Sequence, residues 1–289
     1  MTQEPSEIDK LYYPHWWQKR YAPEEALEKF INYLNTATRT LRNQVRTEFN
    51  IPYGFRNREK YNILGIDLPD DSPIIIYVHG GYWQAKEITH TNQGFISKIF
   101  HKHGIKVITL GYELCPDVEI KDIIIEIETA LRRCLDYAKL NMSKGVHLVG
   151  HSVGAHLVAC MFNNFIPNLS YDDQSLIKSV FLLCGIYDLS PLPQTEINKP
   201  LNLTDKESKA VSPQFMTLSS PEHMKFYVIV AEYDAPPFRE QTEKFHKKLK
   251  ESGFQSTYRL LKGDDHFTVI ERLVDEEYDL TQLILSAIE

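Results

Sequence analysis

The stretch Val146-His-Leu-Val-Gly150-His-Ser-Val-Gly154 decides the fold of this 289-residue chain. Its first four residues form an apolar run of the kind found in buried strands, whereas Val153–Phe165 is apolar almost all round, as in a helix buried in the middle of a sandwich. Between them lies the pattern G-x-S-x-G, whose glycines allow a strand to turn sharply into a helix. The sequence therefore predicts a strand–turn–helix unit with Ser152 on the turn.

Strand-like and helix-like segments alternate on both sides of this turn. Ile74–Val78 is a continuous apolar run bounded by Pro73 and Gly80, which is typical of a strand covered on both faces. The alternation predicts an α/β fold with a mostly parallel central sheet flanked by helices. The other predicted strands are residues 45–51, 60–66, 105–110, 180–184, 226–231 and 256–261, and the other predicted helices are residues 22–42, 92–101, 120–135, 238–250 and one that begins near 268.

Residues 188–223 interrupt the alternation and are richer in Pro, Ser, Thr and Asn. We expect this segment to form a small lid over the carboxyl edge of the sheet, where open parallel sheets bind their ligands. No internal repeat or low-complexity linker divides the chain, so residues 1–289 are predicted to form a single domain.

The composition argues against several classes of function. The formal net charge is −7, so a basic surface for nucleic acid is not expected. Residues 1–10 are polar and acidic, unlike a secretory signal, and no apolar run approaches the roughly 20 residues that span a bilayer. Four cysteines without C-x-x-C spacing indicate buried reduced thiols in a cytoplasmic protein: Cys115, Cys134, Cys160 and Cys184. A structural disulfide and a cysteine nucleophile are the alternatives, and no motif supports either.

The hydroxyl of Ser152 needs a general base within hydrogen-bond reach, and the base needs an acceptor that fixes its tautomer. On the α/β-hydrolase fold, the order along the chain is Ser, then Asp or Glu, then His. His246 lies among lysines of a predicted helix and is interpreted as solvated, while His223 precedes the candidate acids. His266 follows the last predicted strand in the turn Lys262-Gly-Asp-Asp-His266, and we therefore predict it to be the base.

Asp234 is the predicted acid, because it comes just after a predicted strand, where acids of such triads lie. Glu232 is close by, but it falls where the strand is only ending. Asp264 and Asp265 are too near His266 in sequence to approach it easily from the required side. Asp188 follows an earlier strand and is a candidate for bracing the lid instead.

The motif His79-Gly-Gly-Tyr-Trp83 follows the buried strand at residues 74–78. Acyl transfer passes through a tetrahedral oxyanion, which this fold stabilises with backbone N–H groups from this loop and from the residue after the nucleophile. We predict that Gly80, Gly81 and Val153 supply these donors. Tyr82 and Trp83 would then line the entrance and stack on an aryl group, unless Trp83 simply packs in the core.

Together, HGGYW at 79–83, GHSVGAH at 150–156 and GDDHF at 263–267 resemble the kynurenine formamidase (arylformamidase) family of α/β hydrolases. The aromatic stretch Tyr12–Trp17 is similar to the opening segment of that family, and Gly111–Asp117 and Gly185–Leu189 also fit its pattern. Related lipases and esterases more often carry a third glycine at the position of Tyr82. The resemblance covers most of the chain.

The resemblance implies hydrolysis of N-formyl-L-kynurenine to L-kynurenine and formate in tryptophan catabolism, with Ser152, Asp234 and His266 as the triad. The residues alone reach only a serine hydrolase with a small-molecule substrate. A general carboxylesterase with the same triad and a non-catalytic binding protein on this fold are the alternatives. We expect no cofactor and no metal, because the pair His101 and His103 has no supporting carboxylate motif. The oligomeric state is left open.

Overall fold

Eight strands form one sheet in the computed structural model, which describes residues 4–289, so that only residues 1–3 of the polar N-terminus lie outside the description. The strand order is β1-β2-β4-β3-β5-β6-β7-β8; β2 is antiparallel to β1 and β4, and all other pairs are parallel. The predicted mostly parallel sheet is therefore confirmed. The strands are β1 (Thr47–Pro52), β2 (Lys60–Leu64), β3 (Ile74–Val78), β4 (Lys106–Leu110), β5 (Val146–His151), β6 (Ile177–Leu183), β7 (Lys225–Tyr233) and β8 (Gln255–Asp265).

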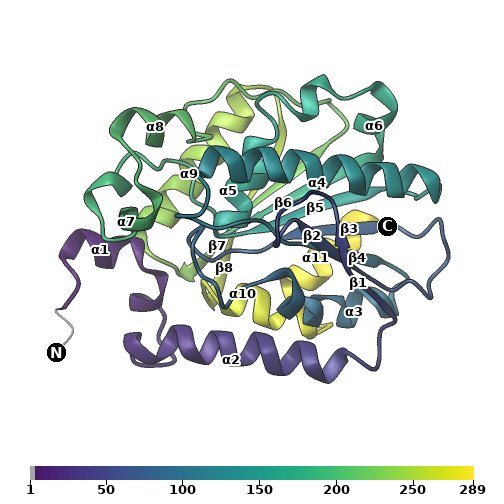
Figure 1. Cartoon of the computed structure of the whole chain (residues 1–289), viewed down its shortest axis with the longest axis horizontal. Coiled ribbons are helices and arrows are strands. Elements are labelled where there is room, and N and C mark those ends of the chain that lie inside the picture. The colour runs from purple at the N-terminus through teal and green to yellow at the C-terminus, as the bar shows by residue number, and fades with distance from the viewer. Residues whose placement is uncertain (1–3) are drawn as a thin grey trace.

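Helices cover both faces of the sheet, as Figure 1 shows. Helices α4, α5 and α9 lie on one face, and α2, α3, α10 and α11 lie on the other. Of the helices in residues 4–289, none is both long and apolar enough to cross a membrane. The helices are α1 (Glu7–Tyr12), α2 (Pro23–Leu41), α3 (Ser97–Lys102), α4 (Ile120–Leu140), α5 (Val153–Cys160), α6 (Tyr171–Leu176), α7 (Asn198–Leu201), α8 (Asp205–Ala210), α9 (Pro236–Glu251), α10 (Thr268–Glu271) and α11 (Asp279–Ile288).

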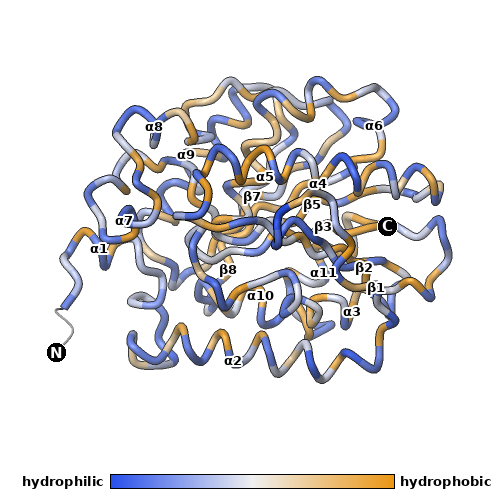
Figure 2. Tube along the Cα trace, viewed as in Figure 1, coloured by the Kyte–Doolittle hydropathy of each residue, from blue (hydrophilic) through white to orange (hydrophobic). Residues whose placement is uncertain are grey.

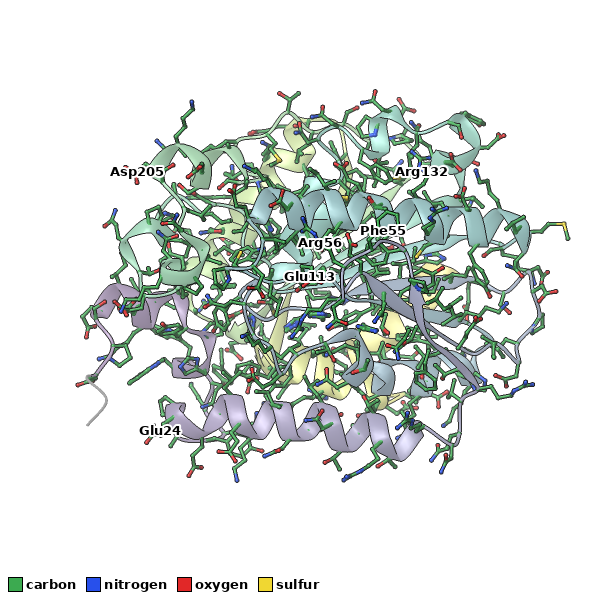
Figure 3. All side chains as sticks on the ribbon, viewed as in Figure 1. Glu24, Phe55, Arg56, Glu113, Arg132 and Asp205 are labelled. Atoms are coloured by element: carbon green, nitrogen blue, oxygen red, sulfur yellow. The ribbon has the colours of Figure 1, made fainter. Side chains whose placement is uncertain are left out.

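The hydrophobic core has two halves, one on each face of the sheet. In Figure 2 the apolar segments gather along the strands and α5, whereas α2 alternates between apolar and polar along its length. Every residue of α5 is buried, while α2 buries only one stripe against the sheet. On the α4 face, Glu126 accepts from the Arg56 guanidinium at 2.9 Å and from the Glu113 backbone N–H at 2.8 Å. These bonds tie the connection between β1 and β2, which contains Arg56, to the segment after β4, and Figure 3 labels Arg56 and Glu113.

Three predicted helices are shorter or more broken than expected. The helix after Ser152 ends at Cys160, because Asn163 and Asn164 disfavour its continuation and Pro167 cannot join it. Residues 90–96 form two 3₁₀ turns before α3, with the Asn92 side chain accepting from the Thr89 N–H at 3.0 Å. The C-terminal helix is split into α10 and α11 by a 3₁₀ turn at Arg272–Val274.

Adjacent strands β3 and β5 lead into connections that run in opposite directions across the sheet. Ligands bind in open α/β sheets at such a switch point, outside the carboxyl ends of the strands. The ends of the two strands pair through Val78 and Gly150, so the loops that follow them, at residues 79–83 and at Ser152, lie side by side.

Above this edge lies a group of segments that we call the cap, namely residues 6–17 with α1 and residues 188–223 with α7 and α8. The two parts are joined: the Glu196 backbone N–H donates to the buried carboxylate of Asp9 at 2.6 Å. Gln84, which follows the loop at 79–83, donates to the Ile197 carbonyl at 3.0 Å. Residues 6–17 thus lie over the carboxyl edge of the sheet together with residues 188–223, whereas the sequence predicts a lid from residues 188–223 alone.

Candidate active site

Ser152 lies between β5 and α5 with φ 56° and ψ −121°, a strained conformation for a residue with a side chain. The flanking glycines make this turn possible. A Cβ on Gly154 would lie 1.9 Å from the Val78 carbonyl oxygen, and one on Gly150 would lie 2.4 Å from the Gly154 oxygen. The Ser152 N–H donates to the Leu183 carbonyl at 2.8 Å, which ties the turn to β6. Only glycine therefore fits on either side of the serine.

Asp234 and His266 come together because they follow the ends of neighbouring parallel strands. Tyr233, the last residue of β7, pairs with Asp265, the last residue of β8, so the next residue of each strand faces the other. His266 Nδ1 lies 3.0 Å from both carboxylate oxygens of Asp234. The two side chains are buried, with residue exposures of 2% for Asp234 and 4% for His266. This bond holds Nδ1 protonated and leaves Nε2 as the basic nitrogen.

The end of β8 departs from the predicted turn. The strand continues through Asp265 with a bulge, since Ala231 pairs with Leu261 but Tyr233 pairs with Asp265. Gly263 takes φ +78° there and donates its N–H to the Glu232 carboxylate at 2.8 Å. Glu232, the alternative acid, therefore braces the bulge that brings His266 into place.

The other acidic candidates have partners of their own. Asp264 accepts from Arg272 at 3.0 Å and from the Tyr278 hydroxyl at 2.9 Å. Asp188 accepts from the Ser190 N–H at 2.9 Å, at the start of the lid segment, in line with the bracing role considered for it. Of the histidines, His223 contacts the Ile177 carbonyl and His246 the Ser256 hydroxyl, so neither joins the pair of Asp234 and His266.

Asp265 links the histidine loop to the N-terminal segment. Arg20 donates to Asp265 from Nε at 2.8 Å and to Glu271 from a terminal guanidinium nitrogen at 2.7 Å. Asp265 in turn accepts from the N–H groups of Phe267 and Thr268, both at 2.9 Å. The residue next to His266 is thus fixed by a charge-assisted network that reaches back to residue 20.

Ser152 and His266 line the same small cavity, which we call the sheet-side cavity. It has a volume of about 20 Å³ and lies on the face of the sheet covered by α2 and α10. The remaining lining residues are Leu27, Phe30, Tyr77, Gly80, Gly81, Tyr82, Ile88, Gln93, His151, Phe267 and Ile270.

Ser152 also lines a second cavity, which we call the cap-side cavity, with a volume of about 10 Å³. Its walls are almost entirely apolar, and Tyr12, Leu192 and Ile197 of the cap form part of them. Trp83 is 1% exposed, so it is both a core residue and a wall of this cavity. Burial raises the pKa of the Tyr82 hydroxyl. The remaining lining residues are Tyr12, Tyr82, Val153, Ile186, Leu192, Ile197 and Phe238.

The loop at 79–83 lies directly against Ser152. A Cβ on Gly80 would be 2.9 Å from the Ser152 Cβ, and Gly81 takes φ +120°. His79 supports the loop from behind, stacked on Tyr112 at 4.5 Å, and the Tyr112 hydroxyl donates to the His79 carbonyl at 2.8 Å. Burial lowers the pKa of His79 to about 3, so this imidazole is neutral.

Val153 is the first residue of α5, so its N–H has no acceptor within the helix. The Val153 N–H comes directly after Ser152 and lies at the positive end of the helix dipole. The Gly80–Gly81 loop and Val153 therefore approach the serine from two sides. Gly80, Gly81 and Val153 are therefore the candidate donors for an oxyanion.

One group of potential metal ligands occurs at this site within residues 4–289: ligand atoms of Cys184, Asp234 and His266 lie within 4.8 Å of one another. Burial raises the pKa of the Cys184 thiol well above its usual range, which disfavours the thiolate that metals prefer. His101 and His103 do not converge, because they pair with Asp67 and Glu276 respectively. The donor chemistry thus fits a hydrogen-bonded acid–base pair better than a metal site.

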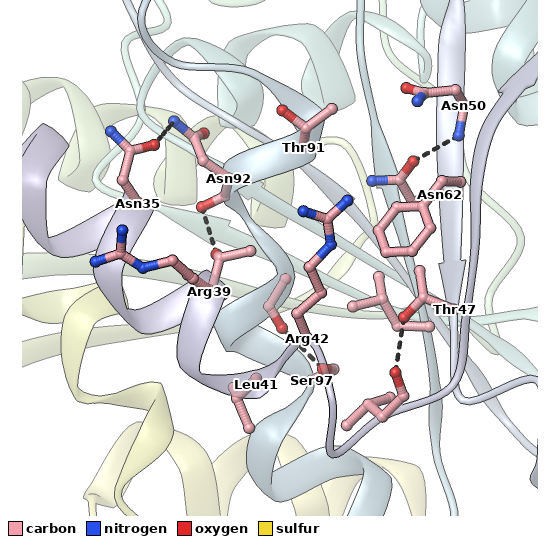
Figure 4. Close-up of a pocket in the computed structure, with 15 residues that line it drawn as sticks. Asn35, Arg39, Leu41, Arg42, Thr47, Asn50, Asn62, Thr91, Asn92 and Ser97 are labelled. Atoms are coloured by element: carbon pink, nitrogen blue, oxygen red, sulfur yellow. Dashed lines mark hydrogen bonds between the residues drawn. The ribbon is translucent and has the colours of Figure 1, made fainter.

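A much larger cavity lies elsewhere, between α2 and the strands β1 and β2 (Figure 4). Its volume is about 400 Å³, and polar side chains such as Arg39, Arg42 and Asn92 line it. Neither Ser152 nor Asp234 nor His266 reaches it. Size alone therefore does not mark the candidate site in this chain.

Known proteins resemble the chain over nearly its full length. The family model of the α/β hydrolase fold matches residues 75–270. The kynurenine formamidase of Danio rerio is 32% identical over 287 residues, which cover 98% of this chain and 96% of the relative. That of Salmo salar is 31% identical, covering 96% and 95%. The solved structure of a protein from Silicibacter sp. TM1040, proposed to be a thioesterase, has a TM-score of 0.78 at 26% identity and covers 98% of each chain.

The sheet, the turn at Ser152 and the family match define an α/β hydrolase. Within this class, the identity of 31–32% to two kynurenine formamidases over almost the whole chain identifies the family. The chain belongs to the kynurenine formamidase family. The resemblance predicted from the three motifs is thereby confirmed.

Proposed function

We propose that this chain hydrolyses N-formyl-L-kynurenine to L-kynurenine and formate through a formyl-enzyme on Ser152. Relatives that carry the name kynurenine formamidase support the substrate. One structural observation carries the mechanism: His266, bonded to Asp234, lines the same cavity as Ser152. The substrate is a small molecule.

In the proposed acylation, the Ser152 hydroxyl attacks the formyl carbon while His266 Nε2 takes its proton. Asp234 stabilises the imidazolium that forms. The oxyanion accepts hydrogen bonds from the Gly80–Gly81 loop and from the Val153 N–H, donors that are typically worth about 3–4 kcal/mol each in the transition state. His266 then protonates the aromatic amine as the C–N bond breaks. Water finally releases formate from the ester on Ser152.

The aryl ketone of the substrate suits the aromatic and aliphatic walls of the cap-side cavity, and its small formyl group needs little room beside Ser152. With volumes of about 20 and 10 Å³, neither the sheet-side nor the cap-side cavity admits the substrate as it stands, since ligand pockets usually measure about 300 Å³ or more. Substrate entry therefore requires the cap to move, as lids do in many enzymes.

We place the reaction in the cytoplasm. The four cysteines are buried and free, and the chain of residues 4–289 contains no disulfide. Such thiols are typical of a reducing compartment.

The test is formate release from N-formyl-L-kynurenine by the purified protein and by Ser152→Ala. We expect kcat/KM to fall at least about a thousandfold in the variant, with the fold retained. Ser175→Ala, a serine far along the chain from the site, is the matched control and should keep full activity. Wild-type protein that releases formate no faster from the formamide than Ser152→Ala does would overturn the proposal.

A comparison of substrates separates this function from that of a general carboxylesterase. We expect activity on simple formate esters as well, because an ester is an easier acyl donor than an amide. A kcat/KM for alkyl acetates that exceeds the value for N-formyl-L-kynurenine would instead favour the esterase.

A further inference from the structure

The sheet-side cavity contains buried polar atoms that the proposed mechanism does not use. Within residues 4–289, neither the Tyr77 hydroxyl nor the Gln93 side-chain oxygen has a hydrogen-bond partner. Both residues are fully buried, at 0% and 1% exposure, and both line the cavity. The Gln93 amide nitrogen donates to the Asn92 side chain at 2.9 Å, which leaves Oε1 as the free end. Buried polar groups without a partner are costly, so such a pair at one cavity points to a polar ligand.

His151 adds a third group to this set. Its Nε2 lies 2.8 Å from the His266 carbonyl oxygen, and because a carbonyl only accepts, Nε2 carries the hydrogen. Burial lowers the pKa of His151 well below its usual value, so the ring is neutral. Nδ1 is therefore an acceptor. It lies on the side of the ring toward Gly80, where an added Cβ would be 3.4 Å away, beside Ser152.

The three groups together offer one donor and two acceptors: the Tyr77 O–H donates, while Gln93 Oε1 and His151 Nδ1 accept. A water molecule is the complement, since it can accept one hydrogen bond and donate two. The cavity volume of about 20 Å³ is enough for one water, which needs roughly 10–15 Å³ and usually makes about three hydrogen bonds when buried.

We propose that Tyr77, Gln93 and His151 bind one water molecule beside Ser152, and that this water hydrolyses the formyl-enzyme. The role in hydrolysis rests on the proposed function, whereas the binding of water does not. Both Ser152 and His266 line the cavity, so the water lies next to the nucleophile and its base. The apolar side chains of Phe30, Ile88 and Phe267 form part of the remaining wall.

The step balances without any further reactant. As the water attacks, it exchanges its hydrogen bond to His151 Nδ1 for one to His266 Nε2, since the two ring centroids are only 4.8 Å apart. The water oxygen bonds to the formyl carbon while that proton passes to His266 Nε2. The bond from that carbon to Ser152 Oγ then breaks, and the serine oxygen recovers a proton from His266. Formic acid leaves and loses its remaining proton to solvent as formate, and the free enzyme is restored. Tyr77, Gln93 and His151 act as positioning residues for the water, because they need not touch the reacting carbon.

A high-resolution crystal structure of the wild-type protein tests the binding of water alone. We expect one ordered water within about 3.2 Å of Tyr77 Oη, Gln93 Oε1 and His151 Nδ1. In Tyr77→Phe the same water should be lost or weakly occupied. A cavity that is dry in the wild-type crystal, or filled by a rearranged side chain, overturns the proposal whatever the enzyme's activity.

Rapid acid quench with 4-nitrophenyl formate tests the role in hydrolysis. Acylation is followed as release of 4-nitrophenol, and deacylation as decay of the formyl adduct on the intact protein. Tyr77→Phe and Gln93→Leu should slow deacylation about tenfold, the loss typical of one hydrogen bond, and leave acylation unchanged. Tyr61→Phe, another buried tyrosine of the same sheet that lines neither cavity, is the matched control.

If the variants slow acylation and deacylation equally, Tyr77 and Gln93 have only a structural role. If deacylation is unchanged in the variants, the bound water takes no part in the reaction. Both results overturn the catalytic part of the proposal. Failure of the proposed function looks different: no formyl adduct forms on Ser152 at all, while the crystal structure still decides whether the water is bound.

Discussion

The two sides of Ser152 are built from different parts of the chain. The sheet-side cavity is walled by strand ends, the loops that follow them and the helices α2 and α10, and it contains the polar groups Tyr77, Gln93, His151 and His266. The cap-side cavity is apolar and takes Tyr12, Leu192 and Ile197 from segments that lie on top of the sheet. From this difference we expect the chemistry to depend on the polar sheet side and the choice of leaving group on the apolar cap side.

The largest effect is expected on the sheet side, from Asp234→Asn. The amide keeps the shape of the carboxylate but disfavours the tautomer with Nδ1 protonated, so kcat should fall about 10⁴-fold. Steady-state kinetics with N-formyl-L-kynurenine measure the change, with the exposed Asp172→Asn as control. A loss below about tenfold would mean that Asp234 does not orient His266.

Buried histidines on both sides should dominate the response to acid. Burial lowers the pKa of His79 to about 3 and of His147 and His156 to about 4, whereas these groups titrate near 6.5 when the chain is unfolded. Below pH 6.5 the unfolded state therefore binds more protons, and stability is lost as the pH falls toward 4.

Each fully buried histidine contributes up to about 1.4 kcal/mol per pH unit in that window. Urea denaturation at pH 7.5, 6.0 and 5.0 measures the trend. We expect little change between pH 7 and 8, and a midpoint that rises on acidification from pH 7 to 5 would contradict the account.

On the cap side, Leu192→Ala should slow the hydrolysis only of substrates that have an aryl leaving group. Removal of the buried methyl groups should lower kcat/KM for N-formyl-L-kynurenine about 10- to 100-fold. Hydrolysis of ethyl formate, which has no aryl group, should stay unchanged. Leu140→Ala, at a leucine that is 85% exposed, is the control. Equal losses on both substrates would erase the distinction between the two sides.

The smallest effect is expected from Arg20, which connects the two sides. Arg20→Ala removes the bonds to Asp265 and Glu271 and loosens the loop of His266. We expect kcat to fall about tenfold or less at unchanged KM, since a displacement below 1 Å costs less than about 10²-fold. Arg20→Lys should restore part of the loss, and the neighbouring Lys19→Ala should have no effect. A change confined to KM would place Arg20 in substrate binding instead.

The sheet side was largely predictable from the sequence, because its residues follow strands and their order is dictated by the fold. Ser152, Asp234 and His266 lie where strand ends put them, although the bulge at Gly263, which brings His266 opposite Asp234, has no signal beyond one glycine. The exclusion of Glu232 on position alone agrees with its contact to that bulge.

The cap side was much harder to predict. Tyr12 and Asp9 meet residues near 196 through contacts that span more than 180 positions, and no local periodicity reports such a pairing. The aromatic stretch at 12–17 was the one available signal. Gln93 and Tyr77 were also missed, since an orphaned polar atom becomes visible only once its neighbours are known.

The burial of every cysteine has a practical consequence for watching the cap open. Cys115, Cys134, Cys160 and Cys184 are all buried, and burial raises the pKa of each thiol, so the native protein should resist maleimides. A Lys199→Cys substitution on α7 would then give a single site for a fluorophore. The emission of this fluorophore would report in real time how fast the cap opens for each substrate, without background from the native cysteines.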